Sequence, residues 1–219
     1  MLKRSSPAAV LWDMDGTLID QTAAIIACFT EVIEGLGYKK PEAETIRRSL
    51  GGPLQSTLLL FVEEQDVSEA TKRFRARFPQ IMYDGLIILE GAMETIEAIQ
   101  IAGIPQAIIT NKHGPTAREV SAFCGFDRYI GLCVGNKDTE FAKPEKALTD
   151  YVLSQLKVSN EGGCLIGDSP TDVATAINAD LICYGITTGS HNSAELLEAG
   201  ATATFQSLHE LRKTFAFTD

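Results

Sequence analysis

From Gly85 to Phe205 the sequence alternates short apolar stretches with segments whose apolar residues recur at helical spacing. Strands that alternate with helices of this length form a parallel sheet, because each parallel connection needs a crossover. The crossover helices then cover both faces of the sheet. The sequence therefore predicts an α/β fold in which most strands are buried.

The pattern is interrupted once, after a first apolar stretch at residues 8–12. The segment that follows, residues 22–82, has helical patterns only. We therefore expect a Rossmann-like parallel core from residues 1–20 and 85–219, with an all-helical cap domain, residues 21–84, inserted into it. Hinges are expected near 19–21 and 84–90. The expected strands are 8–12, 105–110, 130–134, 163–167, 181–185 and an edge strand at 202–205; the expected helices are 22–36, 42–50, 54–64, 68–82 (capped by Ser68), 92–102, 116–124, 146–156, 171–178 and 192–199.

Length and charge narrow the classes of partner. A chain of 219 residues can bury a substantial core, and its net charge of −10 opposes a broad nucleic-acid surface. Apolar stretches fall short of the ~20 residues that cross a bilayer, and the basic start at Met1 to Arg4 leads into no hydrophobic leader segment. We expect a cytoplasmic monomer or homodimer without nucleic-acid or membrane partners.

The cysteines do not suggest a disulfide or metal role. They are five, scattered, and form no C-x-x-C pair. Free cysteine is among the most buried residue types, so we interpret them as small core residues. They are Cys28, Cys124, Cys133, Cys164 and Cys183.

Two carboxylates follow the first expected strand, separated by one apolar residue. Residues two apart in an extended segment point to the same side, so Asp13 and Asp15 can address one ligand. Gly16 then lets the backbone turn. A metal site, an acid/base pair and a simple polar turn all remain compatible with this pair alone.

Further polar residues follow the next three core strands. Thr110 and Asn111 end the second, Lys143 lies in the loop after the third, and Asp168 follows the fourth. Ligands of open parallel sheets bind outside the carboxyl ends of the strands, so residues distant in sequence should converge there.

Such a group of residues suits phosphoryl transfer. Asp13 can attack phosphorus and form an aspartyl-phosphate, but the two anions repel each other. Mg²⁺ held by Asp13, Asp168 and a backbone carbonyl near Asp15 would offset the repulsion, since this ion prefers hard oxygen ligands.

The remaining groups would bind the phosphate and move protons. Lys143 supplies a positive charge, while the Thr110 hydroxyl and the Asn111 amide can donate to phosphate oxygens. Asp15 is left to protonate the leaving oxygen and then to activate water.

Together these motifs resemble the haloacid dehalogenase superfamily of phosphohydrolases. The chain carries D-x-D-G-T at 13–17, T-N at 110–111, K-P at 143–144 and G-D-S-x-x-D at 167–172, in that order. The resemblance implies that Asp13 is nucleophile and metal ligand, that Asp15 is acid/base and main-chain ligand, and that Asp168 is a further ligand.

The inserted helices and Thr110-Asn111-Lys112 most resemble the phosphoglycolate phosphatase-like group. This likeness implies Mg²⁺-dependent hydrolysis of a small-metabolite phosphomonoester. The chain departs from the group at 176–180, which read Ala-Ile-Asn-Ala-Asp, and at Glu90-Gly91, where relatives have Pro-Gly. These departures spare the chemical residues and leave the substrate open.

Other functions share the scaffold. Inorganic pyrophosphate is an alternative substrate, and a sugar-phosphate mutase would return the phosphoryl group to another hydroxyl. A phosphonatase would need a cap lysine, and a dehalogenase would need neither Asp15 nor Asp168. A catalytically silent binding protein would keep the fold, but none of the motif residues is replaced. A dinucleotide site lacks its G-x-G-x-x-G.

Several residues carry two interpretations. Asp172 lies one helical turn beyond Asp168 and is either an outer partner of the metal or a group that serves the helix N-terminus. Either Lys143 or Lys146 could be the lysine of the site. The loop position of Lys143 and the proline that follows it, Pro144, favour Lys143. Lys112 and His113 adjoin the second motif and could reach the substrate, but they are more typical of exposed loop residues.

The expected cap has its own candidates. The loop 51–54 either discriminates substrates or merely connects helices, and Arg47 and Arg48 before it are candidates to contact an anionic substrate tail. Arg73, Arg75 and Arg77 alternate with apolar residues, a pattern that at first sight resembles a nucleic-acid or anion patch. Because Phe74 and Phe78 share one helical face, we interpret these arginines as a solvated surface.

Overall fold

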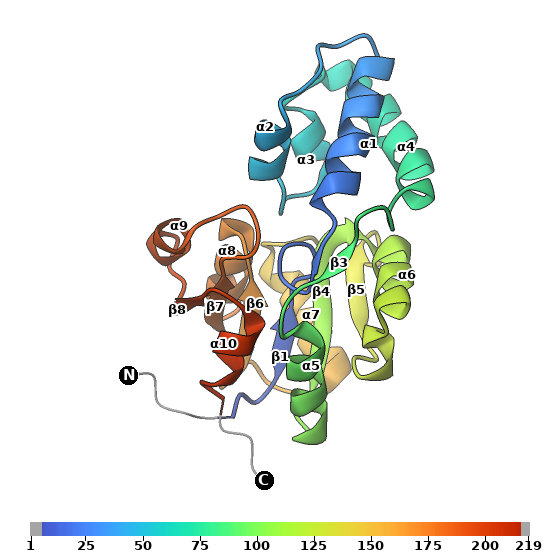
Figure 1. Ribbon diagram of the computed structural model, residues 1–219. Helices are drawn as coiled ribbons and strands as arrows, with labels where there is room; N and C mark the ends of the chain where they lie inside the picture. The colour runs from blue at the N-terminus through green and yellow to red at the C-terminus, as the bar shows by residue number, and fades with distance from the viewer. Residues whose placement is uncertain (1–5, 216–219) are drawn as a thin grey trace.

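The computed structural model describes residues 6–215, which form a six-stranded parallel sheet flanked by helices (Figure 1). The strand order is β5-β4-β1-β6-β7-β8, which confirms the predicted α/β fold and places the last strand at an edge. Met1 to Arg4 lie outside the described residues. The strands are β1 (Val10–Trp12), β4 (Gln106–His113), β5 (Cys133–Asn136), β6 (Cys164–Gly167), β7 (Ile182–Ile186) and β8 (Ala203–Phe205).

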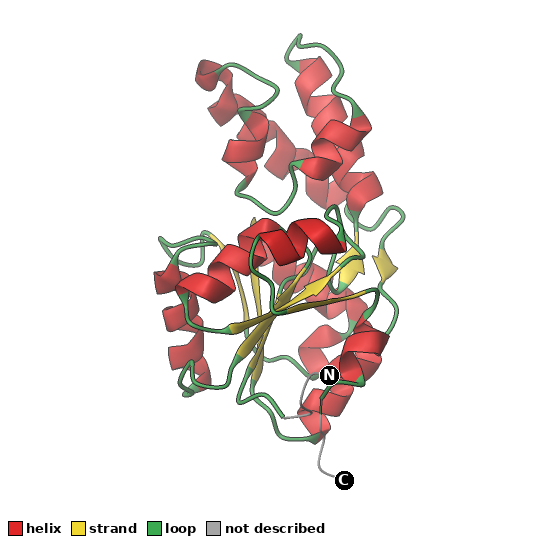
Figure 2. Ribbon diagram, turned by 90° about the vertical axis from the view of Figure 1, so that its left-hand side faces the viewer, coloured by secondary structure: helices red, strands yellow, loops and turns green. Residues whose placement is uncertain are grey.

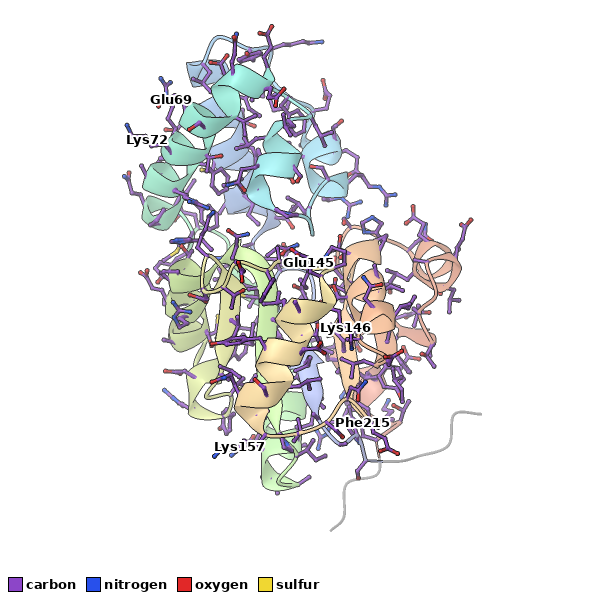
Figure 3. All side chains as sticks on the ribbon, turned by 180° about the vertical axis from the view of Figure 1, so that it is seen from behind. Glu69, Lys72, Glu145, Lys146, Lys157 and Phe215 are labelled. Carbon is purple, nitrogen blue, oxygen red and sulfur yellow. The ribbon has the colours of Figure 1, made fainter. Side chains whose placement is uncertain are left out.

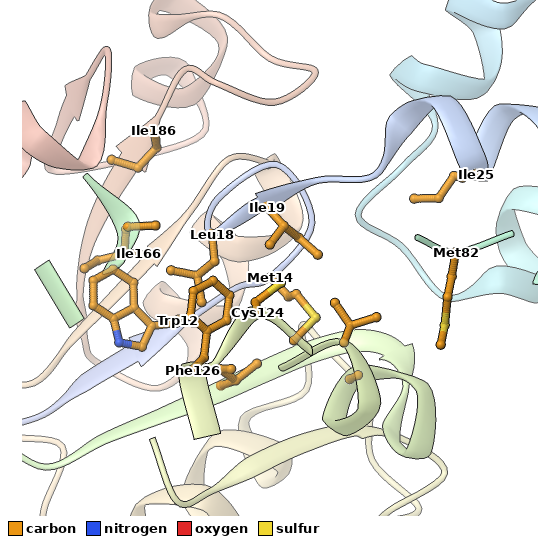
Figure 4. Close-up of a cluster of buried hydrophobic side chains, with 14 of the residues drawn as sticks. Trp12, Met14, Leu18, Ile19, Ile25, Met82, Cys124, Phe126, Ile166 and Ile186 are labelled. Carbon is orange, nitrogen blue, oxygen red and sulfur yellow. The ribbon is translucent and has the colours of Figure 1, made fainter. Parts of the chain in front are cut away.

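Helices pack on both faces of the sheet because successive side chains of its central strand point to opposite sides (Figure 2). Val10 and Trp12 join one apolar cluster, whereas Leu11 joins the other. Trp12 lies in the first cluster with Met14 and Phe126 (Figure 4). The first face carries α5 (Ala92–Ile101), α6 (Gly114–Cys124) and α10 (Leu208–Arg212), and the second carries α7 (Lys146–Leu156), α8 (Pro170–Asn178) and α9 (Ser193–Glu198).

The helical insertion stands at the edge of the sheet where β1 and β4 end (Figure 1). It is entered through β2 (Ile19–Asp20) and left through β3 (Ile87–Ile88), which pair antiparallel. The two segments expected as hinges thus form one short ribbon. The insertion contains α1 (Thr22–Gly35), α2 (Ala43–Arg48), α3 (Leu54–Leu58) and α4 (Val67–Arg77), with short 3₁₀ turns η1 (Glu64–Asp66) and η2 (Phe78–Gln80).

The ends of β4, β5 and α2 are shifted from the predicted ranges, and three further details differ from the prediction. α3 ends at Leu58, because the apolar run 58–62 has no single helical face and turns instead. The expected cap at Ser68 is wrong: α4 begins at Val67, and Ser68 lies in its first turn. α10 was not predicted, although Ser207 caps it by accepting the Glu210 N–H.

Four of the five cysteines are core residues, as expected. All five cysteines are free; Cys133 is partly exposed and the other four are buried. Among residues 6–215, no helix combines the length and the apolar character that a membrane crossing requires.

Candidate active site

The loop after β1 is anchored by its apolar residues. Met14 and Leu18 are fully buried, and the Met14 carbonyl accepts the Leu18 N–H at 2.9 Å. The Gly16 N–H donates to Ile19 at 2.7 Å, with Gly16 at a φ of 88° that favours glycine. This turn fixes Asp13 and Asp15 at the carboxyl end of the strand.

Lys143 is the buried cation of the site. Its Nζ lies 2.5 Å from Asp13 Oδ1 and 2.6 Å from Asp172 Oδ1. Burial alone would lower the pKa of Lys143, but the two carboxylates outweigh it and raise the pKa, so the ammonium stays charged. Its side chain is 1% exposed, whereas that of Lys146 is 47% exposed, at the surface of α7 beside Asp150 (Figure 3). The burial distinguishes Lys143 as the candidate site lysine.

Asp172 serves two partners at once. Its Oδ2 accepts the Ser169 N–H at 3.0 Å and the Ser169 hydroxyl at 2.6 Å, which completes a capping box at the start of α8. Its Oδ1 binds Lys143. The helix-terminal role proposed from the sequence is therefore present, and the same side chain also holds the site lysine.

Three carboxylates form a compact oxygen cluster. Ligand atoms of Asp13, Asp168 and Asp172 lie within 4.8 Å of one another, and all three residues are buried. Burial, together with the charges of the other carboxylates, raises the pKa of Asp168 well above its ordinary value. Burial raises the pKa of Asp13 to about 7, although Lys143 opposes the shift. A bound cation would offset the mutual repulsion of these buried carboxylates.

Two glycines keep the space beside Asp168 open. A Cβ atom at Gly16 would lie 2.6 Å from Asp168 Oδ2, and a Cβ atom at Gly189 would overlap that oxygen. The carboxylate accepts one long hydrogen bond, from the Ser190 N–H at 3.3 Å. The hard oxygen donors and the space beside them fit a small divalent cation.

The side chain of Asp15 is not part of the acidic cluster. Lys112 Nζ lies 2.9 Å from its Oδ1 and 2.8 Å from its Oδ2, and the same ammonium stands 4.9 Å from the centre of the Phe78 ring. Lys112, interpreted from the sequence as an exposed loop residue, thus contacts the predicted acid/base and a residue of the insertion.

Thr110 and Asn111 differ in what they can offer a ligand. The Thr110 hydroxyl oxygen accepts the Lys112 N–H at 3.1 Å, and its own proton has no acceptor among the described residues. Asn111 is fully engaged: Nδ2 donates to Gly51 at 2.9 Å and to the Lys143 carbonyl at 3.2 Å, and Oδ1 accepts the Lys143 N–H at 3.0 Å. Asn111 therefore ties the insertion to the loop of the site lysine.

A cavity of about 900 Å³, counted with its open mouth, lies between the insertion and the sheet. Asp13, Asp15, Thr110 and Asn111 line its core side. The insertion contributes an apolar wall that includes Ile25, Phe29, Leu54, Phe74 and Phe78, and also the Gly51-Gly52 loop.

The arginines of the insertion are placed differently from the prediction. Arg47 and Arg48 do not line this cavity; they donate to the carbonyls of Gly189 at 3.1 Å and Ser190 at 2.5 Å in the core. Arg75 does line it, so its assignment to a solvated surface was wrong. It lies three residues before Phe78, on the same helical side, and that i, i+3 spacing was the available signal.

The chain also resembles known proteins. Residues 10–186 match the model of the family described as haloacid dehalogenase-like hydrolase. The protein named "Putative pyrophosphatase PpaX" from Caldanaerobacter subterraneus subsp. tengcongensis is 32% identical over 78% of this chain and 77% of its own length. A phosphoglycolate phosphatase from Colwellia psychrerythraea is 24% identical over 96% of this chain and 97% of its own.

Solved structures share the fold. The solved structure of a haloacid dehalogenase-like family hydrolase from Streptococcus pneumoniae superposes with a TM-score of 0.85 at 23% identity, covering 95% of this chain and 98% of the other. At this identity the similarity establishes a common architecture.

Proposed function

We propose, from the premise that this chain belongs to the haloacid dehalogenase-like hydrolase family, that it is a Mg²⁺-dependent phosphatase of small phosphorylated metabolites. One observation carries the proposal. The buried carboxylate of Asp13 lies between a buried ammonium and a carboxylate cluster, at the floor of a cavity. This arrangement gives a nucleophile, positive charge for a phosphate and oxygen ligands for a cation.

The metal would be held by Asp13, Asp168 and the main-chain carbonyl of Asp15, with Asp172 as an outer partner through Lys143. The fit rests on the three buried carboxylates and on the space that Gly16 leaves. When bound, Mg²⁺ supplies positive charge that offsets the repulsion between carboxylate and phosphate.

The nucleophile is Asp13. Its free carboxylate oxygen attacks phosphorus in line, and the bond to the leaving oxygen breaks as an aspartyl-phosphate forms. Lys143 neutralises part of the phosphate charge, and the Thr110 hydroxyl donates to a phosphate oxygen. Asn111 takes part in phosphate binding if it releases Gly51; otherwise it orients Lys143.

Asp15 moves the protons. It protonates the leaving oxygen in the first step and then takes a proton from the water that attacks the aspartyl-phosphate. The ion pair with Lys112 occupies both of its oxygens, so this pair must separate when the leaving group enters. Until then, the Lys112 ammonium occupies the position beside Asp15 that the leaving group would take.

The helical insertion acts as a cap domain over residues 21–84, with residues 1–20 and 85–219 as the catalytic core. The Gly51 carbonyl bound to Asn111 and the arginines bound at 189–190 support a cap that docks on the core. Docking excludes bulk water while the aspartyl-phosphate exists.

Pyrophosphate is a second candidate substrate, favoured by the name of the 32% identical relative. It would use the same nucleophile, with phosphate as the leaving group. A sugar-phosphate mutase would leave the transferred phosphoryl group on an organic product. A silent binding protein would release no phosphate.

Phosphate release from a panel of phosphomonoesters tests the proposal. The panel includes phosphoglycolate and pyrophosphate, ranked by kcat/KM with Mg²⁺. We expect release that EDTA abolishes and that Asp13→Asn lowers by at least ~10³-fold, as expected when a nucleophile is removed. A metal-loaded wild-type chain that releases no phosphate from any member would refute the phosphatase assignment.

A further inference from the structure

The side of the cavity formed by α4 carries a positive charge that the protein itself does not neutralise. Arg73 pairs with Glu69 at 2.8 Å, and Arg77 pairs with Glu31 at 2.8 Å. Arg75, between them, has no ion pair among the described residues, and its Nε is buried without a hydrogen-bond partner. A buried donor without a partner is costly, so such a group calls for an acceptor from outside the chain.

Two core residues, His113 and Asn136, line the same cavity. Asn136, at the end of β5, is paired in register with His113 at the end of β4, and its Oδ1 is buried without a hydrogen-bond partner. Burial lowers the pKa of His113, and the charge of Arg75 lowers it further. His113 therefore lies within electrostatic reach of the guanidinium.

The other cationic and anionic groups of the cavity are already paired. Lys112 is bound to Asp15. Asp138, whose negative charge acts on His113, is bound to Arg118 at 2.6 Å. Asp13 is bound to Lys143. Among the charged side chains that line the cavity, Arg75 is thus the one that has no ion pair in the described part of the chain.

The wall around this charge is apolar. Phe29, Phe74 and Phe78 line the cavity together with Arg75, and Phe74 stacks on Phe78 with ring centroids 5.3 Å apart. An occupant that covers these rings gains by removing apolar surface from water.

We propose that Arg75 forms a specificity subsite for a second oxyanion on the leaving group of the substrate. This inference rests on the proposed phosphatase function. The substrate class is a phosphate ester whose leaving group has an apolar body ending in a carboxylate or a second phosphate. The planar guanidinium donates to that oxyanion, whereas Lys143 and Thr110 serve the phosphoryl group that is transferred.

A matched pair of esters tests the subsite. The compounds 4-carboxyphenyl phosphate and 4-carbamoylphenyl phosphate have nearly the same size and shape, and only the first carries a second anion. The wild-type chain should prefer the carboxylate in kcat/KM by about tenfold or more, as expected for a charge-assisted hydrogen bond. The ratio of the two kcat/KM values therefore measures the effect of the second negative charge alone.

Two variants of Arg75, with one control variant, test whether this residue causes the preference for the carboxylate. Arg75→Gln should bring the ratio to about one, and Arg75→Lys should keep part of it because the charge remains. Arg77→Gln removes an arginine of the same helix that binds Glu31, and it should keep the wild-type ratio. A ratio that is already one in the wild-type chain, or that survives Arg75→Gln, overturns the proposal and leaves cavity water as the partner of Arg75.

A second measurement separates this inference from the catalytic one. Dissociation constants of the same two esters for the Asp13→Asn chain, measured by calorimetry, report the subsite whether or not phosphate is released. We expect the same preference for the carboxylate, lost in Asp13→Asn/Arg75→Gln. Equal affinities overturn the subsite, whereas a carboxylate preference in binding without any hydrolysis by the wild-type chain overturns the phosphatase function alone. The melting temperature of Arg75→Gln should not fall, because Arg75 Nε makes no hydrogen bond to lose.

Discussion

Lys143 Nζ lies 2.5 Å from Oδ1 of Asp13, and both side chains are buried at the end of the central strand. The ammonium also binds Asp172, so one lysine compensates two carboxylates. The contact holds the predicted nucleophile in place and supplies the positive charge that an incoming phosphate needs.

Replacing this lysine should be costly both to stability and to activity. Lys143→Met leaves two buried carboxylates uncompensated, so the free energy of unfolding should fall by about 3–5 kcal/mol. Lys146→Met removes only exposed pairs with Asp150 and Asp180 and should change the free energy of unfolding by less than ~0.5 kcal/mol. Urea unfolding of the two variants, with phosphate release measured on the folded protein, checks this. Equal stability of the two variants would contradict the role of Lys143.

The buried charge of Asp13 should make the metal-free chain less stable as pH rises. The pKa of Asp13 is raised by burial from 3.8 to about 7, so the folded chain holds a proton that the unfolded chain releases at lower pH. The contribution of this group to stability therefore falls as pH rises between about 4 and about 7. In EDTA, Asp13→Asn should gain stability over the wild-type chain across this window.

Denaturant unfolding at pH 5 and pH 7.5 measures the gap between the two chains. We expect a larger gap at pH 7.5, and we expect Mg²⁺ to reduce it by stabilising only the chain that keeps the carboxylate. A gap independent of pH would show that Asp13 is ionised in the folded metal-free chain throughout the range.

The position of the acidic cluster was predictable because each motif follows an expected strand. Parallel strands end at one edge of the sheet, so Asp13, Lys143 and Asp168 had to meet once the strand order was known. The role of Asp172 was open, because a residue one turn into a helix can serve the helix or the site. It does both here.

Contacts between the insertion and the core were not predictable in the same way. Lys112 with Asp15, and Asn111 with Gly51, join residues whose local patterns carry no sign of each other. Arg75 was misassigned because the face shared by Phe74 and Phe78 suggested that the arginines lie on the solvated side of the helix, whereas α4 turns Arg75 by its helical phase toward the cavity.

Docking of the insertion should depend on Arg48. It donates to the Ser190 carbonyl and binds Glu195, while the Ser190 N–H donates to Asp168. Arg48→Gln should lower kcat/KM several-fold through this chain of contacts, yet change stability by less than ~1 kcal/mol because the pair is exposed.

Arg73→Gln is the matched control for Arg48→Gln. Its pair with Glu69 is similarly exposed but lies wholly within the insertion. It should leave phosphate release unchanged. If both variants behave alike, the contact of Arg48 with the loop of Ser190 has no part in catalysis.

The loop at Gly51 should tolerate change at only one of its two glycines. Gly51 has a φ of 105°, and a Cβ atom there would lie 2.9 Å from Ser169 Oγ. Gly51→Ala should therefore cost about 1–3 kcal/mol of stability and lower activity by moving the carbonyl that Asn111 binds. A Cβ atom at Gly52 meets open space, so Gly52→Ala should be neutral. Thermal unfolding and phosphate release of the two variants compare them, and equal behaviour would contradict the close approach.

The most direct test of the account is to locate the phosphoryl group on the protein during turnover. The Mg²⁺-loaded chain is mixed with a substrate from the phosphomonoester panel, quenched in acid before the steady state, reduced with borohydride and analysed by peptide mass spectrometry. The account predicts that residue 13 is converted to homoserine, the product of reducing an aspartyl-phosphate, and that the conversion is absent in Asp13→Asn. Phosphate release by a chain in which residue 13 is never modified, or a modification at another carboxylate, would contradict it.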